Sequence, residues 1–379
     1  MSPSSEGSVL NVGIVGSGGI ARQHAIGWTA YPGKARIAAF ADIAIDRAKT
    51  MSGTHTDGVA NAYASLDEML ADESIDVIDI CLPHHLHTDA VIAAAKAGRA
   101  VLCEKPLCTN LDDARKIKQA LDESGVIFMS AHNQLFQPSL LEARRLISSG
   151  TIGTPYFFRS IETFQARSFN PHSNEMAEVG AGQKGWRGDL AQSGGGELLD
   201  TGYHSTYRLL SLANNDRPVE VTGFLSRFLI GHLPTEDTGQ VMVRFESGAM
   251  GEILTSWALD VVGSVQFEAS GEHGALAGSP TDLRHQIYRW PEPAQREFTE
   301  ISSFTAEIGH FIDVVTNGAD NPANIDIATR VLQLIKGAYL SAKLGQTVTL
   351  PENPTDDPVA GSQGATTPFS VEVPDAVLS

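Results

Sequence analysis

A glycine-rich turn near the N-terminus, set between a strand and a helix, restricts the chain to a small group of folds. Residues 9–16 (VLNVGIVG) have the apolar, β-branched pattern of a buried strand, and a helix is expected from about Ile20. Gly16 allows a tight turn, Gly18 lets the backbone approach a ligand, and Ala21 permits close packing of helix on strand. Because the first N–H groups of that helix favour an anion, the turn predicts a site for the pyrophosphate of a dinucleotide.

The second strand is followed by an acidic residue at the position that discriminates between dinucleotides. Residues 36–41 are expected to form this strand, and Asp42 comes directly after it. A carboxylate there accepts hydrogen bonds from the adenosine ribose and repels a 2′-phosphate, which favours NAD over NADP. Two alternatives stay open: Asp42 caps the next helix instead, or the nearby Arg47 accommodates NADP. The contacts predicted around the turn are Gly16, Ser17, Gly18, Gly19, Ile20 and Asp42.

Strands and helices alternate up to about residue 132, which predicts βαβ units and a doubly wound parallel sheet. Further strands are expected at 77–82, 100–103 and 126–130, and helices at 46–51, 66–71, 88–97 and 111–123. The second half differs, because strand-like runs follow one another without helices between them. These runs are 155–163, 219–229, 239–245, 249–258 and 265–271, with helices expected at 139–149, 304–317 and 325–344. Consecutive strands of this kind favour an antiparallel or mixed sheet with one covered face.

We therefore predict an α/β chain of two domains with a tail at each end. The predicted segments are an N-terminal tail over 1–8, a dinucleotide-binding domain over 9–132, an α+β domain over 133–350 and an acidic tail over 351–379. The last segment is rich in Pro, Ser, Thr and Gly and contains no Lys or Arg, which is typical of an extended or poorly ordered segment.

Composition narrows the classes of function. The net charge of −18, from 27 basic and 45 acidic residues, argues against binding to nucleic acid or to an anionic membrane surface. The first residues lack the pattern of a secretory signal, and no apolar run approaches the roughly 18 residues that cross a bilayer. Three cysteines cannot form a disulfide framework. We expect a cytoplasmic protein without nucleic-acid or membrane partners.

Residues 81–87 (CLPHHLH) follow a predicted strand at the edge of the sheet where ligands bind. The three histidines suggest a metal site, but no cysteine or carboxylate nearby completes a plausible set of ligands, so we predict no metal. We expect Leu82, Pro83 and His84 to contact the cofactor, with His84 near the nicotinamide. His87 is expected to cap the next helix within the same cofactor-binding loop.

Two further motifs carry candidate chemistry. In Glu104-Lys105-Pro106 the lysine follows the next strand and points into the crevice, and Glu104 is placed to hold or retune its ammonium. In the glycine-rich segment 193–204, Asp200 and His204 are four residues apart, and helical spacing puts them on one face. A carboxylate that holds an imidazole is a common way to make a general base. The alternatives are a surface Glu–Lys pair and an ordinary polar pair with His204 in the core.

Taken together and in this order, these elements resemble the Gfo/Idh/MocA oxidoreductases, the family of glucose–fructose oxidoreductase and inositol dehydrogenases. The resemblance covers about Leu10–Leu350, and Trp186-Arg187 before the glycines is a further match. It implies an N-terminal Rossmann domain and a C-terminal α+β domain for substrate binding and oligomerisation, with a large, mostly antiparallel open sheet. One departure is that 132–136 (HNQLF) lacks the arginine that many members carry after the sixth strand.

The resemblance also implies roles for individual residues. Lys105, Asp200 and His204 match the catalytic set: His204 takes the hydroxyl proton, Lys105 stabilises the oxygen, and Asp200 orients His204 and favours its protonated form. Glu104, Lys105, Trp186 and Arg187 are expected beside the cofactor. The predicted substrate contacts are Lys105, Gln134, Phe164, Arg187, Asp200, Tyr203 and His204.

The function that follows is an NAD-dependent dehydrogenase or reductase acting on a secondary alcohol or ketone of a sugar, glycoside or cyclitol. An alternative is an enzyme that retains NAD and uses transient oxidation for glycoside cleavage, epimerisation or isomerisation. A third is a non-catalytic dinucleotide-binding regulator. The expected partners are a small sugar or cyclitol and further copies of the chain, as a homodimer or homotetramer through the C-terminal sheet.

Overall fold

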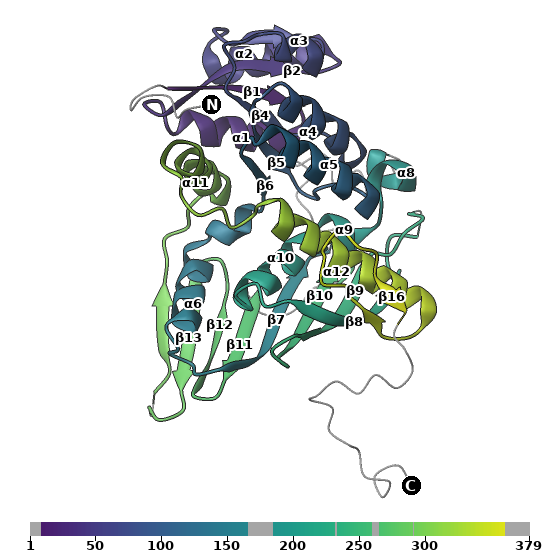
Figure 1. Ribbon diagram of the computed structural model, residues 1–379. Coiled ribbons are helices and arrows are strands. Elements are labelled where there is room, and N and C mark those ends of the chain that lie inside the picture. The colour runs from purple at the N-terminus through teal and green to yellow at the C-terminus, as the bar shows by residue number, and fades with distance from the viewer. Residues whose placement is uncertain (1–8, 166–184, 232, 260–264, 291, 361–379) are drawn as a thin grey trace, which may run out of the picture.

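The computed structural model describes residues 9–165, 185–231, 233–259, 265–290 and 292–360. Within these ranges the chain forms one sheet of six strands and one of ten (Figure 1). The predicted N-terminal tail, 1–8, and residues 361–379 of the predicted C-terminal tail lie outside the described residues.

The N-terminal sheet is entirely parallel, with strand order β3-β2-β1-β4-β5-β6. Its strands are β1 (Leu10–Val15), β2 (Ala35–Ala41), β3 (Asn61–Tyr63), β4 (Val77–Ile80), β5 (Ala100–Glu104) and β6 (Phe128–Ala131). The helices are α1 (Gly19–Thr29), α2 (Ile45–Thr56), α3 (Leu66–Leu70), α4 (His87–Lys96) and α5 (Leu111–Ser124). The doubly wound prediction is confirmed. The order reverses between β1 and β4, and open α/β sheets bind ligands at such a reversal.

The second sheet has the order β14-β13-β12-β11-β7-β10-β9-β8-β15-β16, and only the pair β7–β10 is parallel within the described residues. Its first five strands in the chain are β7 (Pro155–Thr163), β8 (Pro218–Ser226), β9 (Thr238–Phe245), β10 (Met250–Ser256) and β11 (Phe267–Gly271). The others are β12 (Gly274–Gly278), β13 (Asp282–Ile287), β14 (Ala294–Glu297), β15 (Val348–Thr349) and β16 (Val359–Ala360). The prediction of a large, mostly antiparallel sheet is confirmed. Strands β12–β16 were not predicted, because they are short or polar.

Helices of the second half cover one face of this sheet, and some of them also pack against the N-terminal part of the chain (Figure 1). They are α6 (Pro138–Ser148), α8 (Leu190–Ser193), α9 (Glu197–Asp200), α10 (Gly202–Leu212), α11 (Ser303–Asn317) and α12 (Ile325–Leu344). α10 packs on β7 and β10, and α12 packs on β8. α11 lies against α1, where the Tyr31 hydroxyl donates to the carbonyl of Thr305. Among the described residues, every helix is too short or too polar to cross a lipid bilayer.

The predicted C-terminal tail is ordered over its first ten residues. The side-chain amide of Gln333 on α12 donates to carbonyls of Pro351, Asn353 and Asp356. β16 then pairs with β15 and extends the ten-stranded sheet. The prediction of a loose tail is therefore wrong for 351–360, because backbone carbonyls find a buried donor there.

Candidate active site

The glycine turn after β1 has the backbone that its sequence predicts. Gly16 has a φ of +92°, and a Cβ at this position would lie 2.3 Å from the carbonyl oxygen of Cys81, so no other residue fits. α1 begins at Gly19 with Gly18 as its N-cap and without a side-chain hydrogen bond to the cap. The Ser17 hydroxyl is buried and has no partner among the described residues. Uncapped N–H groups beside an unpaired buried hydroxyl fit the phosphates of a dinucleotide.

Asp42 lies against this turn. One carboxylate oxygen accepts the backbone N–H of Ser17 at 2.9 Å, and the other accepts the N–H of Ala44 at 2.8 Å. The residue therefore touches the phosphate turn and also caps the chain that leads into α2. A carboxylate in this position fits an unmodified ribose better than a 2′-phosphate.

The loop with three histidines, 81–87, follows β4. Its side chains contact the segment after β5 and one of the catalytic candidates. His87 is the first residue of α4 and does not cap it, because its imidazole bridges the carbonyl oxygens of Leu82 and Pro106, each at 2.8 Å. His84 has its Nδ1 3.0 Å from the carbonyl oxygen of Ser193, and its ring meets Trp186 edge-on at 4.4 Å between centroids. Burial lowers the pKa of His84 to about 3, so this imidazole is neutral at pH 7.

Lys105 reaches from the N-terminal sheet into the second half of the chain. Its ammonium donates to both the side-chain Oδ1 and the backbone carbonyl of Asp200, each at 3.0 Å. Glu104 does not hold this ammonium, contrary to the prediction. Its carboxylate accepts the backbone N–H of Lys105 at 2.9 Å and contacts His24 Nε2 at 3.0 Å.

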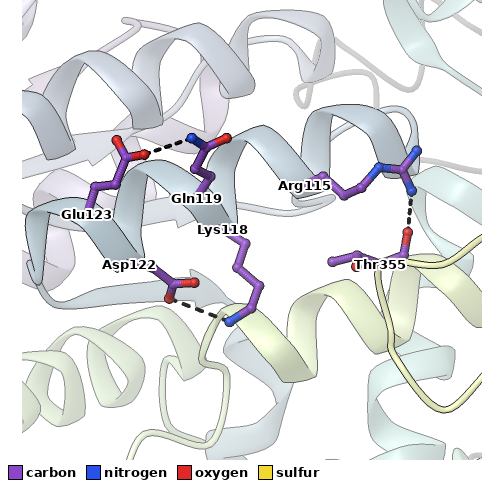
Figure 2. A pocket seen from close by; sticks show the side chains of 6 residues that line it. All are labelled: Arg115, Lys118, Gln119, Asp122, Glu123 and Thr355. Atoms are coloured by element: carbon purple, nitrogen blue, oxygen red, sulfur yellow. Dashed lines mark hydrogen bonds and ion pairs between the residues drawn. The ribbon is translucent and has the colours of Figure 1, made fainter.

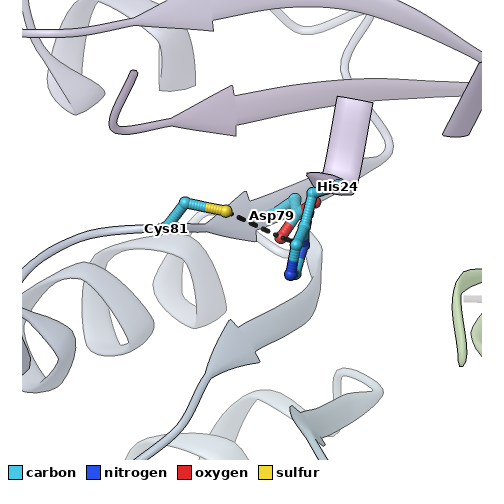
Figure 3. A group of neighbouring side chains, drawn as sticks. All are labelled: His24, Asp79 and Cys81. Carbon is cyan, nitrogen blue, oxygen red and sulfur yellow. Dashed lines mark hydrogen bonds and ion pairs between the residues drawn. The ribbon is translucent and has the colours of Figure 1, made fainter. Parts of the chain in front are cut away.

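His24, Asp79 and Cys81 form a buried polar cluster (Figure 3), and His24 links it to Glu104. His24 contacts the carboxylate of Asp79 at 2.9 Å, and Trp28 donates to the same carboxylate at 2.7 Å. The ligand atoms of His24, Asp79 and Cys81 lie within 4.8 Å of one another, which is close enough for a metal. Burial raises the pKa of the Cys81 thiol to about 12, and both imidazole nitrogens of His24 already face carboxylates. The arrangement therefore favours an internal hydrogen-bond network, which fixes Glu104, rather than a metal site.

Asp200 joins the two halves of the site. Besides Lys105, the guanidinium of Arg187 donates to its second oxygen, and His84 Nε2 lies 3.9 Å away. Burial would raise the pKa of Asp200, but the charges of Arg187 and Lys105 outweigh burial and hold this pKa well below its usual range. Asp200 is thus an anion that binds two cations.

The prediction that Asp200 orients His204 is wrong. α9 ends at Asp200 and α10 begins at Gly202, so the two residues do not share one helix. His204 instead has its Nδ1 2.6 Å from the hydroxyl of Tyr207. Burial and the charge of Lys105 lower the pKa of His204 well below its usual value, so the imidazole is neutral rather than protonated. A neutral imidazole beside an ammonium can accept a proton from a hydroxyl that both of them bind.

The predicted substrate-wall residues divide into different environments. Tyr203 is fully buried and donates its hydroxyl to the carbonyl of Ala328, so it belongs to the core and not to a wall. The Gln134 side chain bonds to Arg208 and lies 3.5 Å from Glu162. Phe164 and Leu229 pack against a small separate cluster formed by Ile230, Leu233 and Trp257.

Two other positions complete this picture. Arg187 stacks over the indole of Trp186 at 4.3 Å and donates to Asp200, and the contact of both residues with the cofactor stays a prediction. Tyr207 was not predicted from the sequence, although its i, i+3 spacing from His204 is a signal that could have identified it.

A hollow elsewhere on the surface contains no residue of this set. It has a volume of about 400 Å³ and lies between α5 and the segment after α12 (Figure 2). Its polar side chains pair with each other or with the backbone, as Lys118 does with Asp122 and Arg115 with the carbonyl of Thr355. Such a rim is already satisfied without a ligand.

Two family models match the halves of the chain on which this geometry depends. Residues 10–132 match the oxidoreductase family with an NAD-binding Rossmann fold, and residues 140–277 match the GFO/IDH/MocA C-terminal domain. The chain belongs to the Gfo/Idh/MocA oxidoreductases. It is therefore an NAD-dependent enzyme of the dehydrogenase and reductase class, and the turn around Gly16 is part of its NAD-binding domain.

Relatives named as a reductase and a dehydrogenase are 26–28% identical to the enzyme over 70% of its sequence. The 1,5-anhydro-D-fructose reductase of Ensifer adhaerens is 28% identical over 70% of this chain and 74% of its own. The levoglucosan dehydrogenase of Pseudarthrobacter phenanthrenivorans is 26% identical over 70% of this chain and 73% of its own. A solved levoglucosan dehydrogenase, in complex with NADH and levoglucosan, superposes with a TM-score of 0.80 at 21% identity over 91% of this chain and 100% of its own, which establishes a common fold.

Proposed function

We propose that this enzyme transfers a hydride between NAD and a secondary alcohol or ketone of a sugar, glycoside or cyclitol. The observation that carries the proposal is the meeting of Lys105, from the end of a dinucleotide-binding sheet, with Asp200 from the other half of the chain. Relatives named for sugar-derived and cyclitol substrates support the substrate class.

Each residue has a distinct task in this proposal. Bound NAD supplies the acceptor or donor of the hydride. His204, neutral and accessible at Nε2, accepts the hydroxyl proton as the alcohol is oxidised. Lys105 donates a hydrogen bond to the same oxygen and stabilises the charge that develops there. Asp200 fixes the Lys105 ammonium and the Arg187 guanidinium, so that the positive groups point into the site.

A panel of polyols, sugars and cyclitols, assayed with NAD and NADP for reduced nicotinamide, tests the proposal. With the best substrate, Lys105→Met should lower kcat by at least about 100-fold, as loss of a donor to a developing charge does. His204→Gln should have a similar effect, and neither should change the Kd of NAD by more than a few-fold. Lys49→Ala, an exposed lysine on α2, is the matched control.

The outcome also discriminates between the competing functions. Turnover of Lys105→Met or His204→Gln within a few-fold of wild type would remove these residues from the mechanism. Product formation without net NADH, from a protein that retains its cofactor through purification, would favour the transient-oxidation alternative. Stoichiometric NAD binding with no turnover across the panel would favour a regulator.

We also propose that the enzyme forms a homo-oligomer through the uncovered face of the ten-stranded sheet. Phe224, Met242 and Met250 point to this face and are 65%, 37% and 46% exposed. Light scattering should give a dimer or tetramer, and Met242→Glu should shift it toward monomer. Val59→Glu, which changes an exposed valine of the other domain, should not.

A further inference from the structure

The two nitrogens of the His204 imidazole lie in different surroundings. Nδ1 is 2.6 Å from the Tyr207 hydroxyl, inside α10. Nε2 has no hydrogen bond to any described residue, and His204 is partly exposed. Only one of the two nitrogens carries a proton in the neutral ring, and a base needs the lone pair at the accessible one. The group at Nδ1 therefore decides whether His204 can act.

The Tyr207 hydroxyl contacts three groups. It accepts the backbone N–H of Gln134 at 3.2 Å, and it lies 2.6 Å from His204 Nδ1 and 3.4 Å from Asn133 Oδ1. A tyrosine hydroxyl offers one proton and two lone pairs, and Gln134 uses one of the lone pairs. The remaining proton and lone pair must be divided between His204 and Asn133.

Asn133 fixes this division. Its amide nitrogen donates to the Ser303 hydroxyl at 2.9 Å, and its oxygen faces Tyr207. That oxygen is an acceptor only, and the Tyr207 proton is the only donor that reaches it among the described residues. If Tyr207 donated to His204 instead, the buried amide oxygen would remain unpaired, and buried polar groups rarely do. All four groups are satisfied only when Tyr207 donates to Asn133 and accepts the proton on His204 Nδ1.

We propose that Tyr207, oriented by Asn133, is a positioning residue that holds His204 in the tautomer whose Nε2 accepts the substrate's hydroxyl proton. The role deepens the proposed function and rests on His204 as its base. In the oxidation the O–H bond breaks and its proton forms an N–H bond at Nε2, while the C–H electron pair leaves as hydride to NAD, which is reduced. The resulting imidazolium keeps its Nδ1–H bond to Tyr207 and then returns the Nε2 proton to solvent.

The surroundings are compatible with this role. Lys105, Asp200, Arg208 and His132 face His204, and Arg208, Glu307 and Glu162 face Tyr207. Burial raises the pKa of Tyr207 well above its usual value, so the hydroxyl keeps its proton throughout the pH range of an assay. The Tyr207 ring is held in place by His132, stacked on it at 4.4 Å and 9°.

Nitrogen-15 NMR of histidine-labelled protein, without cofactor or substrate, tests the tautomer directly, with His204→Gln assigning the signal. Wild type should show a protonated Nδ1 and an unprotonated Nε2 at His204. Tyr207→Phe should give a mixture of tautomers. Asn133→Ala should shift His204 toward Nε2–H, because Tyr207 is then free to donate to Nδ1. A protonated Nε2 in the wild-type protein would overturn the inference, whether or not the variants fold.

Kinetics provide a second readout. Tyr207→Phe should lower kcat by about tenfold or more, with KM within a few-fold, since base catalysis as a whole contributes about 10²–10⁴-fold. The acid limb of its pH–rate profile should move to lower pH, because the imidazolium loses an acceptor. Tyr203→Phe, which removes the hydroxyl of the other buried tyrosine of α10, should keep both kcat and the profile. Unchanged kcat and pH profile in Tyr207→Phe, while His204→Gln is inactive, would refute the positioning role and leave the proposed function intact.

Discussion

At the scale of single residues, the sequence predicts some of the side chains that meet at the site but not how they pair. Lys105 and Asp200 were both identified, and they meet at 3.0 Å. The i, i+4 spacing of Asp200 and His204 suggested a direct pair, but this inference assumes one continuous helix. Thr201 separates α9 from α10, and the Asp200 carboxylate binds Lys105 and Arg187, which the sequence names as site residues but does not pair with it.

The charge of Asp200 has a measurable consequence. Asp200→Asn keeps the size of the side chain but leaves Lys105 and Arg187 without their anion. We expect kcat to fall by at least about 100-fold, and the pKa of His204 to fall further because Asp200 raises it. The acid limb of the pH–rate profile should therefore move to lower pH. Asp189→Asn, which changes a cap nearby in the sequence, is the control, and an unaltered kcat in Asp200→Asn would contradict the assignment.

Asp42 should control the choice of cofactor. Asp42→Asn removes the charge that repels a 2′-phosphate and leaves one side-chain oxygen, which can accept from Ser17 or from Ala44 but not from both. We expect the ratio of kcat/KM for NAD over that for NADP to fall by about tenfold, equivalent to about 1.4 kcal/mol. Asp46→Asn, an exposed carboxylate in the first turn of α2, should leave the ratio unchanged.

Buried histidines should make the fold sensitive to acid. Burial lowers the pKa of His132 to about 3, and neither of its ring nitrogens has a partner among the described residues. The unfolded chain, with a histidine pKa near 6.5, binds more protons than the folded one between these values, so stability falls as pH drops below about 6.5. Chemical denaturation of His132→Phe should show a loss between pH 7 and pH 4.5 smaller than that of wild type, by on the order of 2 kcal/mol. His85→Gln, at an exposed histidine, should behave like wild type.

At the scale of elements, alternation and turn residues predicted the long strands and helices within a few residues. The α12 range of 325–344 was predicted as observed. β3, with three residues, and β14, fully exposed, carry too little apolar pattern to be recognised. Close approaches between elements were also invisible in sequence, because they depend on the partner backbone.

One such approach is between β8 and α12. A Cβ on Gly223 would lie 2.6 Å from the carbonyl oxygen of Ala338, a backbone atom that cannot move alone. Gly223→Ala should lower the free energy of unfolding by about 1–3 kcal/mol. Gly53→Ala, inside α2 with open space around it, should raise stability by about 0.5–1 kcal/mol. Denaturant titration of both variants checks the pair, and equal effects would refute the close approach.

At the scale of the whole molecule, the C-terminal segments fasten the two halves together. α12 packs on β8, and Lys118 of α5 forms an ion pair with Asp326 at the start of α12. The chain after α12 then passes back to α5, where Arg115 donates to the carbonyl of Thr355 (Figure 2).

Truncation tests the contribution of residues 351–360 to stability. A chain that ends at Leu350 leaves the buried amide of Gln333 without its carbonyl partners, which should cost about 1–3 kcal/mol. A chain that ends at Ala360 keeps every one of these contacts and should melt close to wild type. Thermal unfolding compares the two, and equal Tm values for both truncations would show that 351–360 adds no stability.

The contact between the segment before α12 and strand β6 has a consequence for synthesis on the ribosome. β6 is the edge of the first sheet, and the Ser130 N–H donates to the Ala323 carbonyl while Asn321 donates to that of Phe128. Asn321 is 193 residues beyond Phe128, so at about 5–20 residues per second the edge waits about 10–40 s for its cover. During that interval the outer edge of β6 in the nascent N-terminal domain is unpaired, which is an opening for aggregation and a target for chaperones.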